Sequence, residues 1–121
     1  MIKTTKKDFQ IFKKECVKWL QVFGLKGWEI HYSHEKIKLE WSASCSYNFT
    51  GRVATLTLNT ERDEDYYNTK DIKKDAFHEV CEVFLARISV LAESRYIAET
   101  DIKEEAHAII QTLGNILFTG D

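Results

Sequence analysis

Proline is absent from this sequence, and only five of its 121 residues are glycine. The lack of proline-rich or glycine-rich stretches argues against low-complexity linkers, and no internal repeat divides the chain. A length of 121 residues suits one domain and leaves little room for a second. Apolar residues make up 44% of the chain, which is enough for one core. The sequence therefore predicts a single domain over residues 1–121.

Long apolar runs are also missing. No stretch approaches the roughly 18 residues that a membrane-spanning helix needs, and the first residues are polar, unlike a secretory signal. The three cysteines, Cys16, Cys45 and Cys81, are far apart, and no CxxC pair occurs. This pattern argues against a disulfide framework and against a thiolate zinc clip. We expect a cytoplasmic protein with no membrane contact.

Neither sign of charge dominates: the sequence has 17 lysines and arginines and 19 aspartates and glutamates, which gives a net charge of -2. A protein that binds nucleic acid usually carries a clear excess of positive charge on one face. The aromatic residues Trp41, Tyr47 and Phe49 are candidates for stacking on bases, but few basic residues lie near them in the sequence. We interpret them as packing residues and expect no nucleic-acid partner.

The hydrophobic periodicity predicts an α+β domain with three helices and three strands. Residues 60–69 show no apolar period and read as a loop, whereas a glycine-containing turn at 48–51 indicates a hairpin. Thr100 is expected to cap the last helix. Short connections between the strands favour a small, mostly antiparallel three-stranded sheet packed on the helices. The expected helices are 7–23, 71–93 and 99–118, and the expected strands are 28–32, 39–48 and 52–59.

The most informative segment lies in the expected helix 71–93 and reads His78-Glu79-Val80-Cys81-Glu82. His78 and Glu82 are four residues apart, so they project from the same side of the helix and are spaced to share one metal ion. Glu79 lies beside His78 and is placed to act on a metal-bound water, like the general base of zinc peptidases with a His-Glu-x-x-His motif. The same spacing is also compatible with a simple ion pair, and Cys81 is interpreted as a packed apolar residue.

A catalytic zinc site needs a third protein ligand. The expected helix 99–118 offers Glu105 and His107, which flank its apolar stripe from opposite sides. The rotation of this helix does not follow from the sequence, so we treat the two residues as equal candidates.

The order of these segments resembles a known family. A strand at Trp28-Glu-Ile30, a strand ending Ala54-Thr-Leu56-Thr-Leu58, the motif helix and a terminal helix carrying Glu and His are similar to the minimal zincin-like metallopeptidases of phages and prophages. The resemblance covers roughly residues 8–118. It departs from the family at Glu82, which stands where the motif has its second histidine.

The resemblance implies a zincin-like fold with zinc held by His78, Glu82 and either His107 or Glu105, and with Glu79 as the catalytic base. It also implies that the strand at residues 54–58 aligns an extended peptide substrate. The rival hypothesis is a non-catalytic inhibitor or accessory protein that keeps the scaffold and binds a protein partner without metal, because a fold alone does not define a function.

Overall fold

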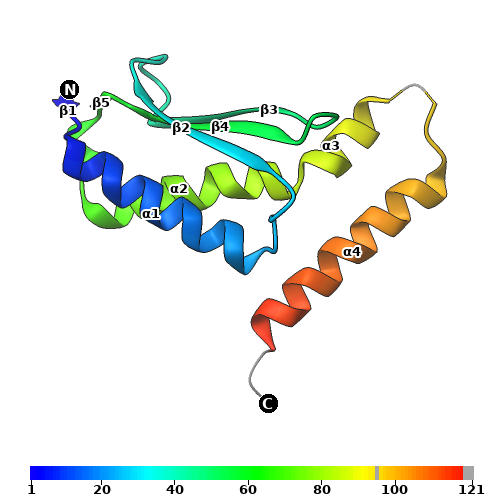
Figure 1. Cartoon of the computed structure of the whole chain (residues 1–121). Coiled ribbons are helices and arrows are strands. Elements are labelled where there is room, and N and C mark those ends of the chain that lie inside the picture. The colour runs from blue at the N-terminus through cyan, green and yellow to red at the C-terminus, as the bar shows by residue number, and fades with distance from the viewer. Residues whose placement is uncertain (95, 119–121) are drawn as a thin grey trace.

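The computed structural model describes residues 1–94 and 96–118. Figure 1 shows a small sheet covered on one face by two helices that lie side by side, with a third long helix standing apart from them. The class is α+β, as the sequence predicts. In chain order the elements are β1 (Ile2–Lys3), α1 (Lys6–Val22), β2 (Glu29–Glu35), β3 (Ala43–Asn48), β4 (Val53–Asn59), β5 (Glu61–Arg62), the 3-10 helix η1 (Glu64–Tyr66), α2 (Thr69–Phe84), α3 (Ala86–Glu93) and α4 (Glu99–Leu117).

The main sheet has the strand order β2-β4-β3, with β4 antiparallel to β3 but parallel to β2. The expected hairpin is therefore present, whereas the parallel pairing differs from the mostly antiparallel sheet that the short connections suggested. β4 takes the centre of the sheet with both edges paired, and its alternate residues Ala54, Leu56 and Leu58 are buried in the core with α1 and α2. β3 is left as an edge strand.

Asn59 at the end of β4 holds the chain where it crosses from β2 to β3. Its buried side chain donates from Nδ2 to the carbonyls of Lys38 (3.2 Å) and Trp41 (2.7 Å), and its Oδ1 accepts from the Glu61 backbone at 3.2 Å. A buried amide with these partners is well satisfied and is costly to replace. The contact fixes loop 36–42 at one end of the sheet.

The two packed helices begin with side-chain caps. Thr5 accepts from the Asp8 backbone while Asp8 accepts from the Thr5 backbone, which is a capping box for α1. Asn68 accepts from the Asp71 backbone and caps α2. The helices bury their apolar faces together against β4, in a core formed by Phe12, Cys16, Phe23, Ala54, Leu56, Leu58, Ile72, Ala76, Val80 and Val83.

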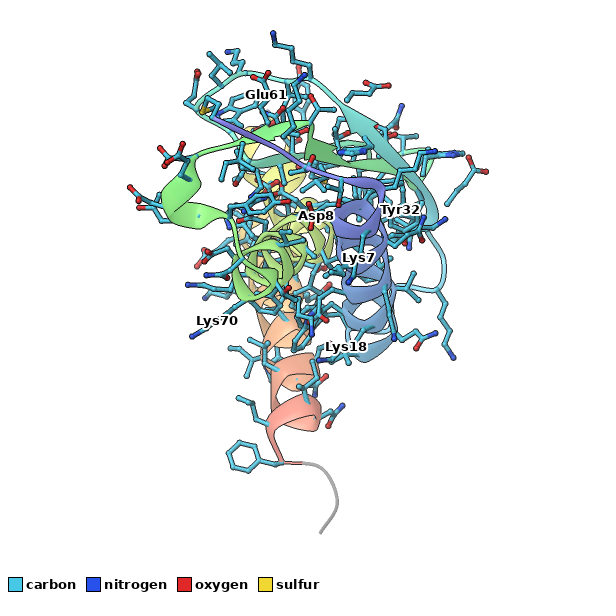
Figure 2. All side chains as sticks on the ribbon, turned by 90° about the vertical axis from the view of Figure 1, so that its left-hand side faces the viewer. Lys7, Asp8, Lys18, Tyr32, Glu61 and Lys70 are labelled. Carbon is cyan, nitrogen blue, oxygen red and sulfur yellow. The ribbon has the colours of Figure 1, made fainter. Side chains whose placement is uncertain are left out.

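Arg62 joins the start of α2 to the small β1–β5 sheet. It is 1% exposed, and its guanidinium donates from Nη2 to Asp75 at 2.6 Å and from Nε to the Tyr66 carbonyl at 2.9 Å. Nearby, the Tyr67 hydroxyl donates to Asp8 at 2.7 Å and so connects η1 to α1. Figure 2 views the molecule from this end, with Asp8 near the start of α1 and Glu61 on β5 above it. Polar contacts therefore hold the end of the fold that the apolar core does not reach.

The C-terminal half differs from expectation in two ways. The predicted helix 71–93 is interrupted at Leu85, whose φ of -92° and ψ of 3° separate α2 from α3. The last helix begins after Ala98, not at a Thr100 cap, and the Ala98 backbone donates to Asp101. No described residue of α4 is buried, and α4 packs mainly on α3. No helix among residues 1–94 and 96–118 is both long and apolar enough to span a membrane.

The central position of β4 predicts a large cost for Leu56→Ala. Leu56 is 0% exposed, so the substitution should lower the free energy of unfolding by about 2–5 kcal/mol through lost transfer energy and a residual cavity. Urea unfolding followed by circular dichroism measures this change. Val17→Ala on the exposed face of α1 is the control, with an expected change within about 0.5 kcal/mol. Equal effects of the two substitutions would contradict the burial of Leu56 in the core.

Candidate metal centre under an edge strand

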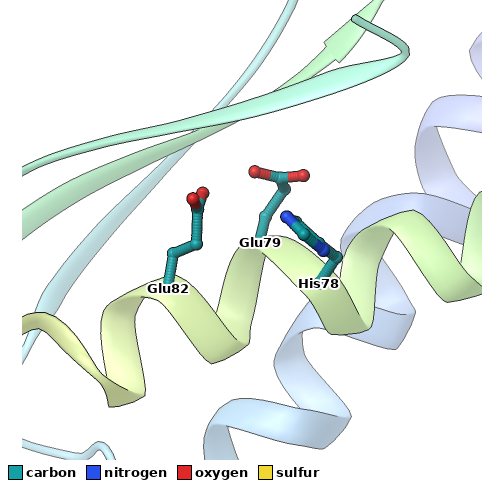
Figure 3. Close-up of side chains that lie close together, drawn as sticks. All are labelled: His78, Glu79 and Glu82. Atoms are coloured by element: carbon teal, nitrogen blue, oxygen red, sulfur yellow. The ribbon is translucent and has the colours of Figure 1, made fainter.

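Three motif residues meet on the upper side of α2. His78, Glu79 and Glu82 each offer a metal-ligand atom, and these atoms all lie within 4.8 Å of one another. Figure 3 shows the carboxylates of Glu79 and Glu82 projecting from the helix toward the sheet, with the His78 imidazole beside Glu79. This is the only such group of His, Cys, Asp or Glu side chains within residues 1–94 and 96–118. The ligand atoms of His78 and Glu82 therefore lie close together, and a carboxylate oxygen of Glu79 lies within 4.8 Å of both.

Glu79 lies on the buried side of α2. Helical spacing puts it in line with Ile72, Ala76 and Val83, all of which belong to the core. Only 6% of Glu79 is exposed, whereas His78 and Glu82 are exposed. The neighbour of the Glu79 carboxyl group is the Glu82 carboxyl group, with which it can share a proton in a hydrogen bond. A buried carboxylate without a donor or a cation is costly, so its position requires a physical explanation.

The surroundings of Glu79 favour its neutral form when no cation is present. Burial, followed by hydrogen bonding with Glu82, the charge of Glu82 and the charge of Asp75, raises the pKa of Glu79 to about 8. Two neighbouring carboxyl groups do not both ionise easily unless a cation lies between them. Without a cation, one of the two keeps its proton and shares it with the other. Glu79 and Glu82 are thus arranged to share a positive group.

The site is a cavity of about 320 Å³ between α2 and β3. The wall opposite the motif is built by Trp41 and by the β3 residues Ala43, Ser44 and Cys45. Burial, with the charges of Glu82 and Glu79 added, raises the pKa of the Cys45 thiol to about 12. No sequence motif marks Trp41 or Cys45 as site residues, because they reach the motif only through the strand order.

The donor set fits a divalent cation. One imidazole and two carboxylates are ligands that zinc accepts, and a closely spaced pair of carboxylates is neutralised by a double positive charge. The three side chains come from one helix, which holds their backbones in a fixed relation. Zinc fits best with a histidine present, although Mn²⁺ and Fe²⁺ accept the same donors.

The two candidates for a third ligand on α4 are not in this group. Glu105 forms an ion pair with Arg87, with its Oε2 3.0 Å from the arginine Nε, and lines a separate cavity beside Trp28. His107 is exposed on α4. The chain bends at Leu85, and α4 then packs on α3 and not along the motif face of α2. The structure therefore does not bring Glu105 or His107 to His78 and Glu82.

The strand beside the site is β3, and not residues 54–58 as the resemblance implied. Those residues belong to β4, whose two edges are both paired. The Asn59 backbone donates to the Ser42 carbonyl at 3.0 Å, and hydrogen-bonded positions alternate along an antiparallel pair. The backbone groups of Ala43, Cys45 and Tyr47 therefore point away from β4, to an edge that no described strand occupies.

Comparison of the chain with models of known protein families, with curated proteins and with solved structures finds no match. The function of the chain is therefore inferred from the geometry of the site and from the residues that form it.

The raised pKa of Glu79 predicts a pH dependence of stability in metal-free protein. Its ordinary pKa is 4.5 and its folded value is about 8, so between these values the folded state holds a proton that the unfolded state has lost. Stability should then be highest below pH 5 and should fall toward pH 8, by about 1 kcal/mol per pH unit. Urea unfolding with chelator at pH 5, 6.5 and 8 measures the slope.

Glu79→Gln should remove most of this slope, because the amide cannot ionise. Glu104→Gln, at an exposed position of α4, is the matched control and should leave the slope unchanged. A Glu79→Gln protein with the original slope would show that Glu79 is not the titrating group.

Proposed function

We propose that this chain is a zinc-dependent peptidase with a zincin-like arrangement of a motif helix under a substrate-binding edge strand. The observation that carries the proposal is the nearly buried carboxylate of Glu79, which lies with His78 and Glu82 in one potential metal-binding group inside a cavity. In the proposal His78 and Glu82 hold the ion and Glu79 is the base. No described side chain takes the place of the third protein ligand expected from Glu105 or His107, so water or substrate would complete the coordination.

The free edge of β3 supports an extended peptide as the substrate. A peptide that pairs with the outward backbone groups of Ala43, Cys45 and Tyr47 adds a strand to the sheet, which gives main-chain hydrogen bonds without a demand on sequence. The same stretch of β3 lines the cavity opposite His78 and Glu82. A peptide on this edge would pass above the three motif side chains.

Each residue then has a stated role. Zinc held by His78 and Glu82 would supply Lewis acidity, which would lower the pKa of a water molecule and polarise the peptide carbonyl. Glu79 accepts the proton of the attacking water, because the charge of a bound cation would favour its ionised form. It then passes the proton to the leaving amine. Glu82 contributes a negative ligand where a His-Glu-x-x-His motif has a neutral histidine, so we expect a weaker Lewis acid and slower turnover.

The proposal predicts near-stoichiometric zinc in protein purified without an affinity tag or chelator. His78→Ala should weaken zinc binding by about a hundredfold or more, beyond the loss typical of an outer-shell partner. Elemental analysis and competition with a chromophoric chelator measure both quantities. His107→Ala is the control and should bind zinc as before, because His107 lies outside the metal-ligand group. Protein that binds no divalent ion would remove the basis of the proposal.

Glu79→Gln separates a base from a ligand. If Glu79 is the base, zinc affinity should change by less than about tenfold while hydrolysis falls by 10²-fold or more. Quenched fluorescent peptide libraries and zinc titration of the same preparation measure the two effects. A loss of zinc affinity as large as that of His78→Ala would instead make Glu79 a ligand and contradict its role as base.

One observation favours the rival function of a non-catalytic protein-binding module. The described part of α4 leaves Ile110, Leu113 and Leu117 between 40% and 73% exposed, and such a row of apolar side chains is typical of a binding surface. A Glu79→Gln protein with an unchanged biological effect would favour this function over peptidase activity.

A further inference from the structure

A second cavity, of about 440 Å³, adjoins the candidate metal centre along α2. It lies between the first turns of α2, the crossing loop 39–42 and the β5–η1 segment 61–66. Trp41 lines both cavities, so the two are neighbours under the same loop. The candidate metal centre does not use this second cavity, which we call the acidic cavity.

The acidic cavity carries a clear excess of negative charge. Its walls contain the carboxylates of Glu40, Glu61, Asp63, Asp71 and Asp75, against only two cations, Arg62 and Lys74. Among the described residues the one ion pair in its walls joins Arg62 to Asp75. Of the other four carboxylates, Asp63 accepts from the Asp65 backbone at 3.0 Å. The carboxylates of Glu40, Glu61 and Asp71 form no ion pair among the described residues, and together the four can attract a positive group.

Two aromatic side chains give the acidic cavity walls that suit an alkyl ammonium or guanidinium group. Trp41 is 48% exposed and Tyr66 is 61% exposed, so both rings are accessible to a ligand. The Lys38 ammonium already lies 4.9 Å from the centroid of the Trp41 ring. Lys38 does not line the cavity, so a ligand cation would take the other face of the Trp41 ring or displace Lys38.

Arg62 adds a second and independent sign of a ligand. It lines the cavity and is 1% exposed, and its Nη1 has no hydrogen-bond partner among the described residues. A buried guanidinium nitrogen without an acceptor is costly, and a carbonyl oxygen would satisfy it. The cavity therefore combines an unsatisfied donor with carboxylates and aromatic rings. A peptide that carries a basic side chain offers a partner to each of them.

The spacing along α2 relates the acidic cavity to the metal centre. Asp75 and Asp71 precede His78 by three and seven residues, which correspond to about 4.5 and 10 Å along a helix axis. An extended peptide advances about 3.3 Å per residue. A substrate side chain one to three residues from the peptide bond that lies at the metal centre would thus reach the acidic cavity.

We propose that the acidic cavity binds a lysine or arginine side chain of the peptide substrate, one to three residues from the cleaved bond. This inference rests on the peptidase function proposed above for its place in catalysis. Recognition of the basic side chain itself requires only the cavity and is independent of the metal.

The test measures binding to metal-free protein. A blocked tripeptide with central lysine is titrated by NMR or calorimetry, and the same peptide with norleucine, which has no charge, is the ligand control. Lysine should bind about tenfold more tightly than norleucine, with the largest shifts at Trp41 and Tyr66, and added salt should reduce the difference. Equal binding of the two peptides would overturn the proposal.

A protein variant with matched shape tests which carboxylates act. The double substitution Glu40→Gln with Asp71→Asn removes two charges from the cavity and should weaken lysine peptide binding about threefold to tenfold, without an effect on norleucine peptide binding. Glu104→Gln on α4 is the control and should change neither. Unchanged lysine binding in the double variant would contradict the assignment to this cavity.

The two proposals fail in distinguishable ways. Selective binding of lysine peptide without zinc-dependent hydrolysis would remove the peptidase function and leave the basic-side-chain site. Hydrolysis that shows no preference for lysine or arginine within three residues of the cleaved bond would leave the peptidase function and remove the acidic cavity as its specificity site.

Discussion

The burial of Glu79 against the core is the constraint on which the site depends. α2 must bury Ile72, Ala76, Val80 and Val83 to complete the core with α1 and β4, and the same packing carries Glu79 under the sheet. A carboxylate in that position is stable only if a proton, a donor or a cation compensates it. The apolar packing of the fold thus places the Glu79 carboxylate beside His78 and Glu82, where a cation held by those two residues would compensate its charge.

The order of the strands in the sheet determines which residues form the walls of the site. Because β4 lies in the centre, β3 becomes the edge strand over the motif, and its residues Ala43, Ser44 and Cys45 form the opposite wall. Asn59 holds the crossing loop through the carbonyls of Lys38 and Trp41, so Trp41 stands between the metal cavity and the acidic cavity. One buried amide therefore organises the approach to both recesses.

In the C-terminal half of the chain, hydrophobic periodicity alone does not predict where the helices break or how they pack. Apolar residues continue in helical spacing through Leu85, so the pattern predicts one helix where the chain has two. Glu105 and His107 have suitable chemistry and lie on a correctly predicted helix, yet that helix packs on α3, and Glu105 pairs with Arg87. The direction of α4 depends on the break at Leu85 before it, and no residue type at this position predicts the break from the sequence.

The sequence by itself determined the α+β class, the positions of α1, α4 and the β3–β4 hairpin, and the adjacency of His78, Glu79 and Glu82, because periodicity and helical spacing are local properties. Only the tertiary structure decided that β2 and β4 are parallel and that β3, not residues 54–58, borders the motif. It also brought Trp41, Cys45 and the acidic cavity to the site. These pairings and contacts join segments that are far apart in the chain. They depend on which whole strands and helices are buried against one another, which local sequence does not specify.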